Sequence, residues 1–145
     1  MMGQQTSDQS QLFYLFNLER RIPTGHLLRL VDPVVSRILM ELREKLAPFY
    51  SEIGRPSIDP ELMIRMLIIG YCYGIRSERQ LCEELELHLA YRWFCRLDLD
   101  DKVPHHSTFS ENRLHRFRQS DVFRHVFERV VATCRSEERR VGKEC

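Results

Sequence analysis

Three neighbouring aspartates are the first residues whose types could support chemistry. Asp98, Asp100 and Asp101 lie within four residues of one another. Carboxylates can hold two divalent metal ions that activate an attacking oxygen, but in such sites they come from separate structural elements. Because these three share one short segment and no strand pattern accompanies them, we expect an exposed break between helices.

The histidines and cysteines also lack the spacing of metal ligands. His105 and His106 are adjacent, and His115 and His125 follow nine and ten residues later, which does not match spacings such as H-x₃₋₅-H. The five cysteines include no C-x-x-C pair, so we expect neither a disulfide framework nor a zinc site. No glycine-rich phosphate loop and no G-x-S-x-G motif occurs. The sequence therefore predicts no bound cofactor.

Charge is segregated along the second half of the chain, although the formal net charge is only +1. Residues 77–101 carry seven acids and three arginines, a net charge of −4. Residues 102–135 carry seven basic residues and three acids, a net charge of +4. This asymmetry favours a nucleic-acid surface on the second stretch. The alternative is a solvated helix face that pairs with the acidic stretch before it.

A helix predicted to open near Ser107 carries the candidate DNA contacts. Its first turn could offer free backbone N–H groups to a phosphate. Arg113 and Arg116 are three residues apart and share one helix face. Arginine, asparagine and serine side chains contact phosphates and base edges. The predicted contacts are Ser107, Thr108, Ser110, Asn112, Arg113, Arg116 and Arg118.

A competing DNA site is the pair of helices predicted over 77–87 and 90–97. The break near His88 gives the pair the spacing of a helix-turn-helix. Its basic residues are Arg79, Arg92 and Arg96. Because the pair is otherwise acidic and aromatic, we expect it to support the core rather than to face DNA.

Local start and stop signals predict an all-α fold, a compact domain of about five to six helices with helix-turn-helix-like pairs. Asp59-Pro60 opens an apolar central helix, which Gly74 ends. Ser77 and Gln80 form a capping box. The remaining signals are Asp32-Pro33 before a helix over 33–46, Ser107 or Thr108 as a cap, and Ser120-Asp121 before a last helix.

The chain divides into three parts. Residues 1–21 form an N-terminal arm whose apolar residues 12–16 could be a short strand or a segment that docks on the core. Residues 22–134 form the helical domain. Residues 135–145 lack an apolar stripe and resemble translation into unrelated flanking DNA, so we expect a disordered tail. No leader and no membrane-spanning run is visible, so we expect a cytoplasmic protein with no membrane partner.

The stretch from Gly54 to Thr133 closely resembles the N-terminal domain of bacterial insertion-sequence transposases of the InsH type. The resemblance covers more than half the chain. The motifs that carry it are Gly54-Arg55-Pro56 before Asp59-Pro60, the apolar helix ending at Gly74, Ser77-Glu78-Arg79-Gln80-Leu81, Tyr91-Arg92-Trp93-Phe94, and Pro104-His105-His106-Ser107-Thr108-Phe109-Ser110.

The resemblance implies a function. In this family the domain precedes a DDE catalytic domain that uses magnesium, and it is taken to help bind the terminal inverted repeats, which are double-stranded DNA. The first catalytic aspartate would lie beyond Thr133, so we expect no enzyme activity from this chain on its own. The alternative is a helical dimerisation or assembly module. Its contacts would be the aromatic helix at 91–94 and a face with Phe123 and Phe127, which leaves a homodimer open.

Overall fold

The described residues of the chain form helices joined by loops. The structure is a computed structural model that describes residues 2–4, 9–10, 12–41, 44, 58–119 and 122–144. Side chains are described within these ranges except at 115–119, 122–123 and 137–144. The helices are α1 (Leu18–Arg21), α2 (Leu27–Glu41), α4 (Pro60–Cys72), α5 (Glu78–Leu87), α6 (Leu89–Phe94), α7 (His106–Gln119) and α8 (Val122–Glu144). The predicted all-α fold is confirmed for the described ranges, and the short α1 was not foreseen.

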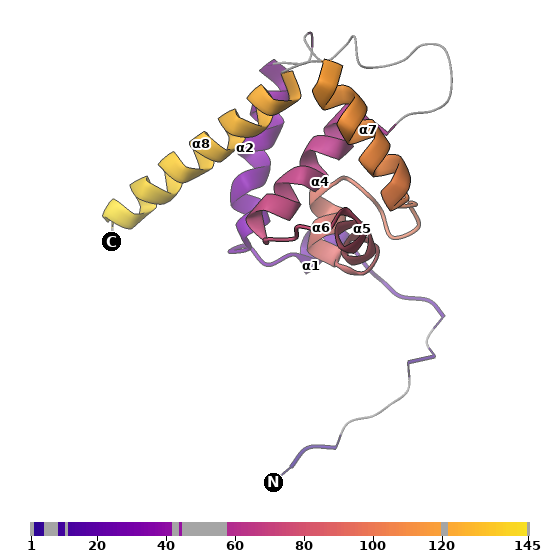
Figure 1. The fold of residues 1–145 in the computed structure, drawn as a ribbon. Coiled ribbons are helices and arrows are strands. Elements are labelled where there is room, and N and C mark those ends of the chain that lie inside the picture. The colour runs from indigo at the N-terminus through magenta and orange to yellow at the C-terminus, as the bar shows by residue number, and fades with distance from the viewer. Residues whose placement is uncertain are drawn as a thin grey trace.

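Helix α4 supplies the centre of the core. Met63, Ile64, Met66 and Ile69 on it are all buried. Helix α8 packs against α2 and α4, α7 packs against α5, and α6 contacts α1, α2 and α5 (Figure 1). The apolar composition of α4 on nearly every side explains its central place.

The predicted signals at the two ends of α4 are confirmed. The Asp59 carboxylate accepts a hydrogen bond of 2.8 Å from the backbone N–H of Glu61. Pro60 occupies the first helical position, where its missing N–H costs nothing. Gly74 follows the last turn with a φ of 65°, a conformation that glycine adopts without strain.

Helix α2 begins earlier than the Asp32-Pro33 signal predicted, and that prediction was wrong. The helix starts at Leu27 and contains Pro33 in its interior. The His26 Nδ1 atom accepts the N–H of Leu28 at 3.1 Å, so His26 takes the capping role. The Asp32 carboxylate instead forms tertiary ion pairs, described below. A tertiary partner has therefore overridden a local signal.

Helix α8 continues through residues 136–144, where the sequence predicted disorder. Glutamate and arginine, which fill positions 137–140, favour helix. Extending an existing helix also avoids the cost of nucleation. The predicted caps Ser120 and Asp121, and the predicted last turn of α2 at residues 45–46, lie outside the described residues.

Candidate nucleic-acid interface

The start of α7 lies at the surface, as a phosphate-binding helix start must. Phe109 is fully buried and fixes the helix to the core. Ser107 and Thr108 are exposed. The helix begins at His106, and the cap is His105, whose Nδ1 accepts the N–H of Ser107 at 3.2 Å. The predicted cap at Ser107 or Thr108 was therefore off by two or three residues, because an imidazole nitrogen can accept as an Asx oxygen does.

Two of the predicted DNA contacts turn toward α5. The Ser110 hydroxyl donates a hydrogen bond to Oε2 of Glu78. The Arg113 Nε atom lies 2.5 Å from Oε1 of the same carboxylate. The Arg113 side chain nevertheless keeps 42% of its surface exposed. Arg113 of α7 thus pairs with an acid of α5, a contact that the alternative of a helix face paired with the acidic stretch expects.

Asn112 bonds within its own helix. Its side-chain amide donates to the carbonyl oxygen of Thr108 at 2.8 Å. The side chain is half-buried. The Asn112 amide is therefore already engaged within α7.

The side chains of Arg116 and Arg118 lie outside the described residues, but their helix positions follow from the backbone of α7. Position 116 is seven residues after buried Phe109, about two turns, and shares its side of the helix. Position 118 is eleven residues after exposed Ser107, about three turns, and shares the exposed side. The helical repeat thus places positions 116 and 118 on different sides of α7, although both arginines were predicted as DNA contacts.

In the competing DNA site at α5 and α6, the central arginine, Arg92, is buried in the domain. Arg92 is only 4% exposed. Its guanidinium donates hydrogen bonds to the carbonyl oxygens of Asp98 at 2.7 Å, Asp101 at 3.1 Å and Glu86 at 3.1 Å. Arg92 therefore holds the loop that follows α6. The sequence signal for this burial is an arginine that stands among the aromatic residues 91–94.

The other two arginines of that pair are engaged as well. Arg96 donates to Oδ2 of Asp32 at 3.0 Å. Arg79 is exposed on α5 and lies 3.3 Å from Glu83 in an i,i+4 ion pair. Arg96 shares the Asp32 carboxylate with the buried Arg65.

The acidic loop after α6 forms a turn. The Asp101 carboxylate accepts the N–H of Asp98 at 2.7 Å, and the Asp98 carboxylate accepts the N–H of Leu99 at 2.8 Å. Within the part of the chain that the structure describes, no group of three His, Cys, Asp or Glu residues is placed to hold a metal ion. No helix in the same part is both long and apolar enough to cross a bilayer.

The predicted dimerisation contacts on α6 are largely core. Tyr91 and Phe94 are buried, so they cannot face a partner, and that part of the alternative was wrong. Trp93 is half-buried and donates from Nε1 to Glu19. Phe127 packs edge-on against Tyr71 at 5.5 Å, and the Phe123 side chain lies outside the described residues.

Comparison with known proteins places the chain in a family. No curated protein and no solved structure matches it. One family model does match, described as Transposase domain (DUF772), over residues 16–115. The match runs from the end of the N-terminal arm through α1 to the middle of α7. Because it spans well over half of the sequence, the chain belongs to the DUF772 transposase-domain family.

Proposed function

We propose that this transposase-family domain binds double-stranded DNA at the terminal inverted repeats of its element. The observation that carries the proposal is the charge asymmetry between residues 77–101 and 102–135, at −4 and +4. The first stretch forms α5, α6 and the acidic turn, and the second forms α7 and the first half of α8. The acids of the first stretch thus lie on α5, α6 and the acidic turn, and the net positive charge belongs to α7 and α8.

The exposed side of α7 supports the contact. Ser107 and Thr108 are exposed in its first turn, and Lys102 is exposed in the loop before it. Hydroxyl and ammonium groups at a helix start donate to phosphate oxygens. Position 118 extends the same side by three turns.

Arg113 has a second role in this proposal. Its ion pair with Glu78 fixes α7 against α5, while its exposed part remains at the edge of the proposed surface. Rigid placement of a recognition helix lowers the entropy lost on binding. Ser110 serves the same anchoring purpose through Glu78.

The proposed role of the chain is binding rather than strand cleavage. DDE chemistry needs separated carboxylates that hold two metal ions. Asp98 and Asp101 instead accept backbone N–H groups of one turn. Magnesium would belong to a catalytic domain rather than to these residues.

Fluorescence anisotropy with a terminal-repeat duplex tests the surface. We expect Lys102→Ala and Arg118→Ala each to weaken binding and to make the salt slope shallower by about one unit, because each loses one phosphate contact. Arg79→Ala is the matched control, because Arg79 is equally basic and 72% exposed on acidic α5. Weakened binding in the control, with both test variants unchanged, would move the interface to α5.

The alternative is an assembly module that makes no DNA contact. The exposed apolar arm at the N-terminus favours some self-association. The two functions differ in their salt dependence, because apolar association does not release counterions. Substitutions also separate the two functions, because self-association would depend on residues of the N-terminal arm and DNA binding on residues of α7.

A further inference from the structure

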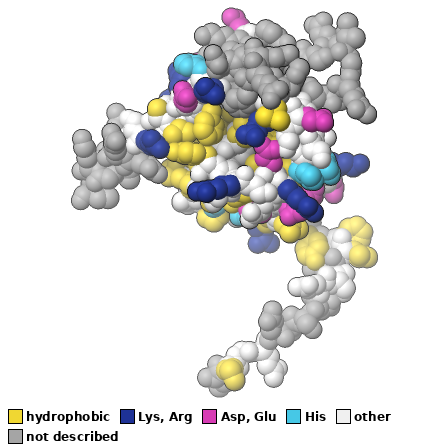
Figure 2. All heavy atoms as spheres, viewed as in Figure 1, with side chains coloured by type: hydrophobic (Ala, Val, Ile, Leu, Met, Phe, Trp, Pro, Cys, Tyr) yellow, Lys and Arg dark blue, Asp and Glu magenta, His cyan; other side chains and the backbone are white. Residues whose placement is uncertain are grey.

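The N-terminal arm exposes a run of apolar side chains. Leu12 is 86% exposed, Tyr14 63% and Leu15 108%. In Figure 1 the arm leaves the helices and extends away from them, and Figure 2 shows hydrophobic side chains along it. Contiguous exposed apolar residues mark an interaction site far more often than isolated ones do.

The root of the arm is held in place. The Asn17 side chain caps α1 by accepting the N–H of Arg20 at 3.3 Å. The Glu19 carboxylate accepts hydrogen bonds from Arg29 at 2.7 Å and from Nε1 of Trp93. The arm therefore projects from a fixed point, and its apolar segment is presented outward.

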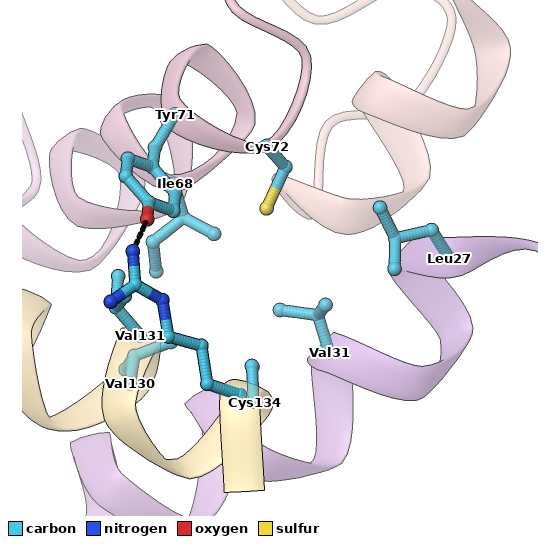
Figure 3. A pocket seen from close by; sticks show the side chains of 9 residues that line it. Leu27, Val31, Ile68, Tyr71, Cys72, Val130, Val131 and Cys134 are labelled. Atoms are coloured by element: carbon cyan, nitrogen blue, oxygen red, sulfur yellow. Dashed lines mark hydrogen bonds between the residues drawn. The ribbon is translucent and has the colours of Figure 1, made fainter. Parts of the chain in front are cut away.

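An apolar pocket of about 290 Å³ lies between α2, α4 and α8. Leu27, Val31, Ile68, Val130 and Val131 form its apolar wall (Figure 3). A cavity of about 150 Å³ holds one benzene molecule, so this pocket has room for about two side chains of that size. The arm offers such side chains in Leu12 to Phe16.

The rim of the pocket also fits the arm. Arg135 lies at the rim and donates to the Tyr71 hydroxyl at 2.7 Å. A guanidinium over an aromatic ring is favourable, and the arm carries Tyr14 among its apolar residues. Residues 1–17 contain one acid, Asp8, and no basic residue, so the arm does not repel the rim.

We propose that the Leu12–Phe16 segment of one copy occupies the α2–α4–α8 pocket of a second copy, in a reciprocal homodimer. An exchanged arm of this kind has two-fold symmetry, so both contacts form at once. Two aromatic side chains per pocket, burying about 150–250 Å² each, give about 600–1,000 Å² over the two exchanged arms before the surface of the pockets is counted, against roughly 1,200–2,000 Å² for a stable interface. The proposal does not depend on DNA binding by α7.

Oligomeric state gives the first test. We expect wild-type chain to sediment as a dimer at micromolar concentration and Leu12→Asp/Leu15→Asp to sediment as a monomer, because buried aspartate would oppose docking. Met2→Asp is the matched control on the same arm, since Met2 is exposed and lies outside the apolar segment. A monomeric wild type, or a dimer that both variants retain, would overturn the proposal.

Crosslinking identifies the contact itself. The Cys72 and Cys134 thiols line the pocket, so Leu15→Cys places a third thiol opposite them when the arm is docked. In a Cys145→Ser background, mild oxidation should give a disulfide-linked dimer on a non-reducing gel. The dimer should disappear when Cys72 and Cys134 are both changed to serine. A crosslinked monomer would mean that the arm folds onto its own pocket, and no crosslink would mean that it does not dock. Either result overturns the exchange.

Discussion

Arg65 is buried at the centre of the core and links three helices. It is a charged side chain on the central helix with only 1% of its surface exposed. Its guanidinium donates to Asp32 at 2.8 Å, to the carbonyl oxygen of Phe94 at 3.0 Å and to Ser36 at 3.1 Å. Arg65 thereby ties α2, α4 and α6 together, and the Asp32 carboxylate also accepts from Arg96.

Replacing Arg65 should destabilise the domain strongly. We expect Arg65→Met to lower the free energy of unfolding by about 3–5 kcal/mol, because it leaves Asp32 without its buried partner. Urea denaturation followed by circular dichroism measures this. Arg79→Met is the control, and its exposed ion pair should be worth less than about 1 kcal/mol. Equal losses in the two variants would contradict the role given to Arg65.

Three helices share an unusual device, a histidine at the cap. His26, His88 and His105 each accept a backbone N–H through Nδ1, at the starts of α2, α6 and α7. An imidazole accepts only in its neutral form. Protonation would also place a positive charge at the positive end of a helix dipole. The cap at His88 therefore favours the folded chain only while its imidazole is neutral.

His88 makes this dependence measurable. Burial, and then the charge of His26, lower the pKa of His88 below its ordinary value, while Glu84 opposes the shift. The unfolded chain therefore binds a proton at His88 more readily than the folded chain. The contribution is fully present above the ordinary pKa of about 6.5 and is lost as the pH falls toward the lowered value.

The corresponding experiment is a pH series of denaturation curves. We expect His88→Asn, which keeps a capping side chain but does not titrate, to lose less stability than wild type between about pH 7 and pH 5. His125→Asn, at an exposed position on α8, is the control for the substitution itself. If the His88→Asn and wild-type curves run parallel, the cap does not titrate as described.

The last part of α8 should contribute little to the stability of the domain. Its residues 136–144 are helical, yet their sequence has no apolar stripe to bury. We expect deletion of residues 136–145 to leave the thermal midpoint unchanged within about one degree, because the sequence of this segment offers little apolar surface to bury. Differential scanning calorimetry checks this. A fall of several degrees would show that the segment packs on the domain.

How far the sequence predicts this fold depends on the range of each interaction. The caps at Asp59 and Ser77 and the stop at Gly74 were predictable, because the partner atoms lie within four residues. The Asp32-Pro33 signal misled, because Asp32 pairs with Arg65, thirty-three residues away. Distance along the chain hides such partners from local patterns.

The candidate site divides in the same way. The basic character of residues 102–135 and the exposed start of α7 could be read from the sequence. The contact of Arg113 with Glu78 could not, because it needs the packing of α7 on α5. The burial of Arg92 could not be read either, because its guanidinium donates to the carbonyl oxygens of Glu86, Asp98 and Asp101, which lie six to nine residues away and beyond the reach of a helical pattern.

At the scale of the whole molecule, the proposed role in DNA binding predicts that this chain alone does not cleave or join DNA strands. We expect no nicking or strand transfer of terminal-repeat DNA with magnesium or manganese, because the acidic turn holds its carboxylates on backbone N–H groups. A gel assay with supercoiled and linear substrates checks this. Reproducible nicking that disappears in an Asp98→Asn, Asp100→Asn or Asp101→Asn variant would contradict it.

The central claim is that the domain recognises the ends of its element as DNA. Its most direct test is the dissociation constant for a terminal-repeat duplex and a scrambled duplex of the same length, measured from about 50 to 200 mM salt. The account predicts that affinity for both falls steeply with salt as counterions are released, and that the repeat binds more tightly at every salt concentration. Equal affinity for the two duplexes, or no binding at the lowest salt, would contradict it.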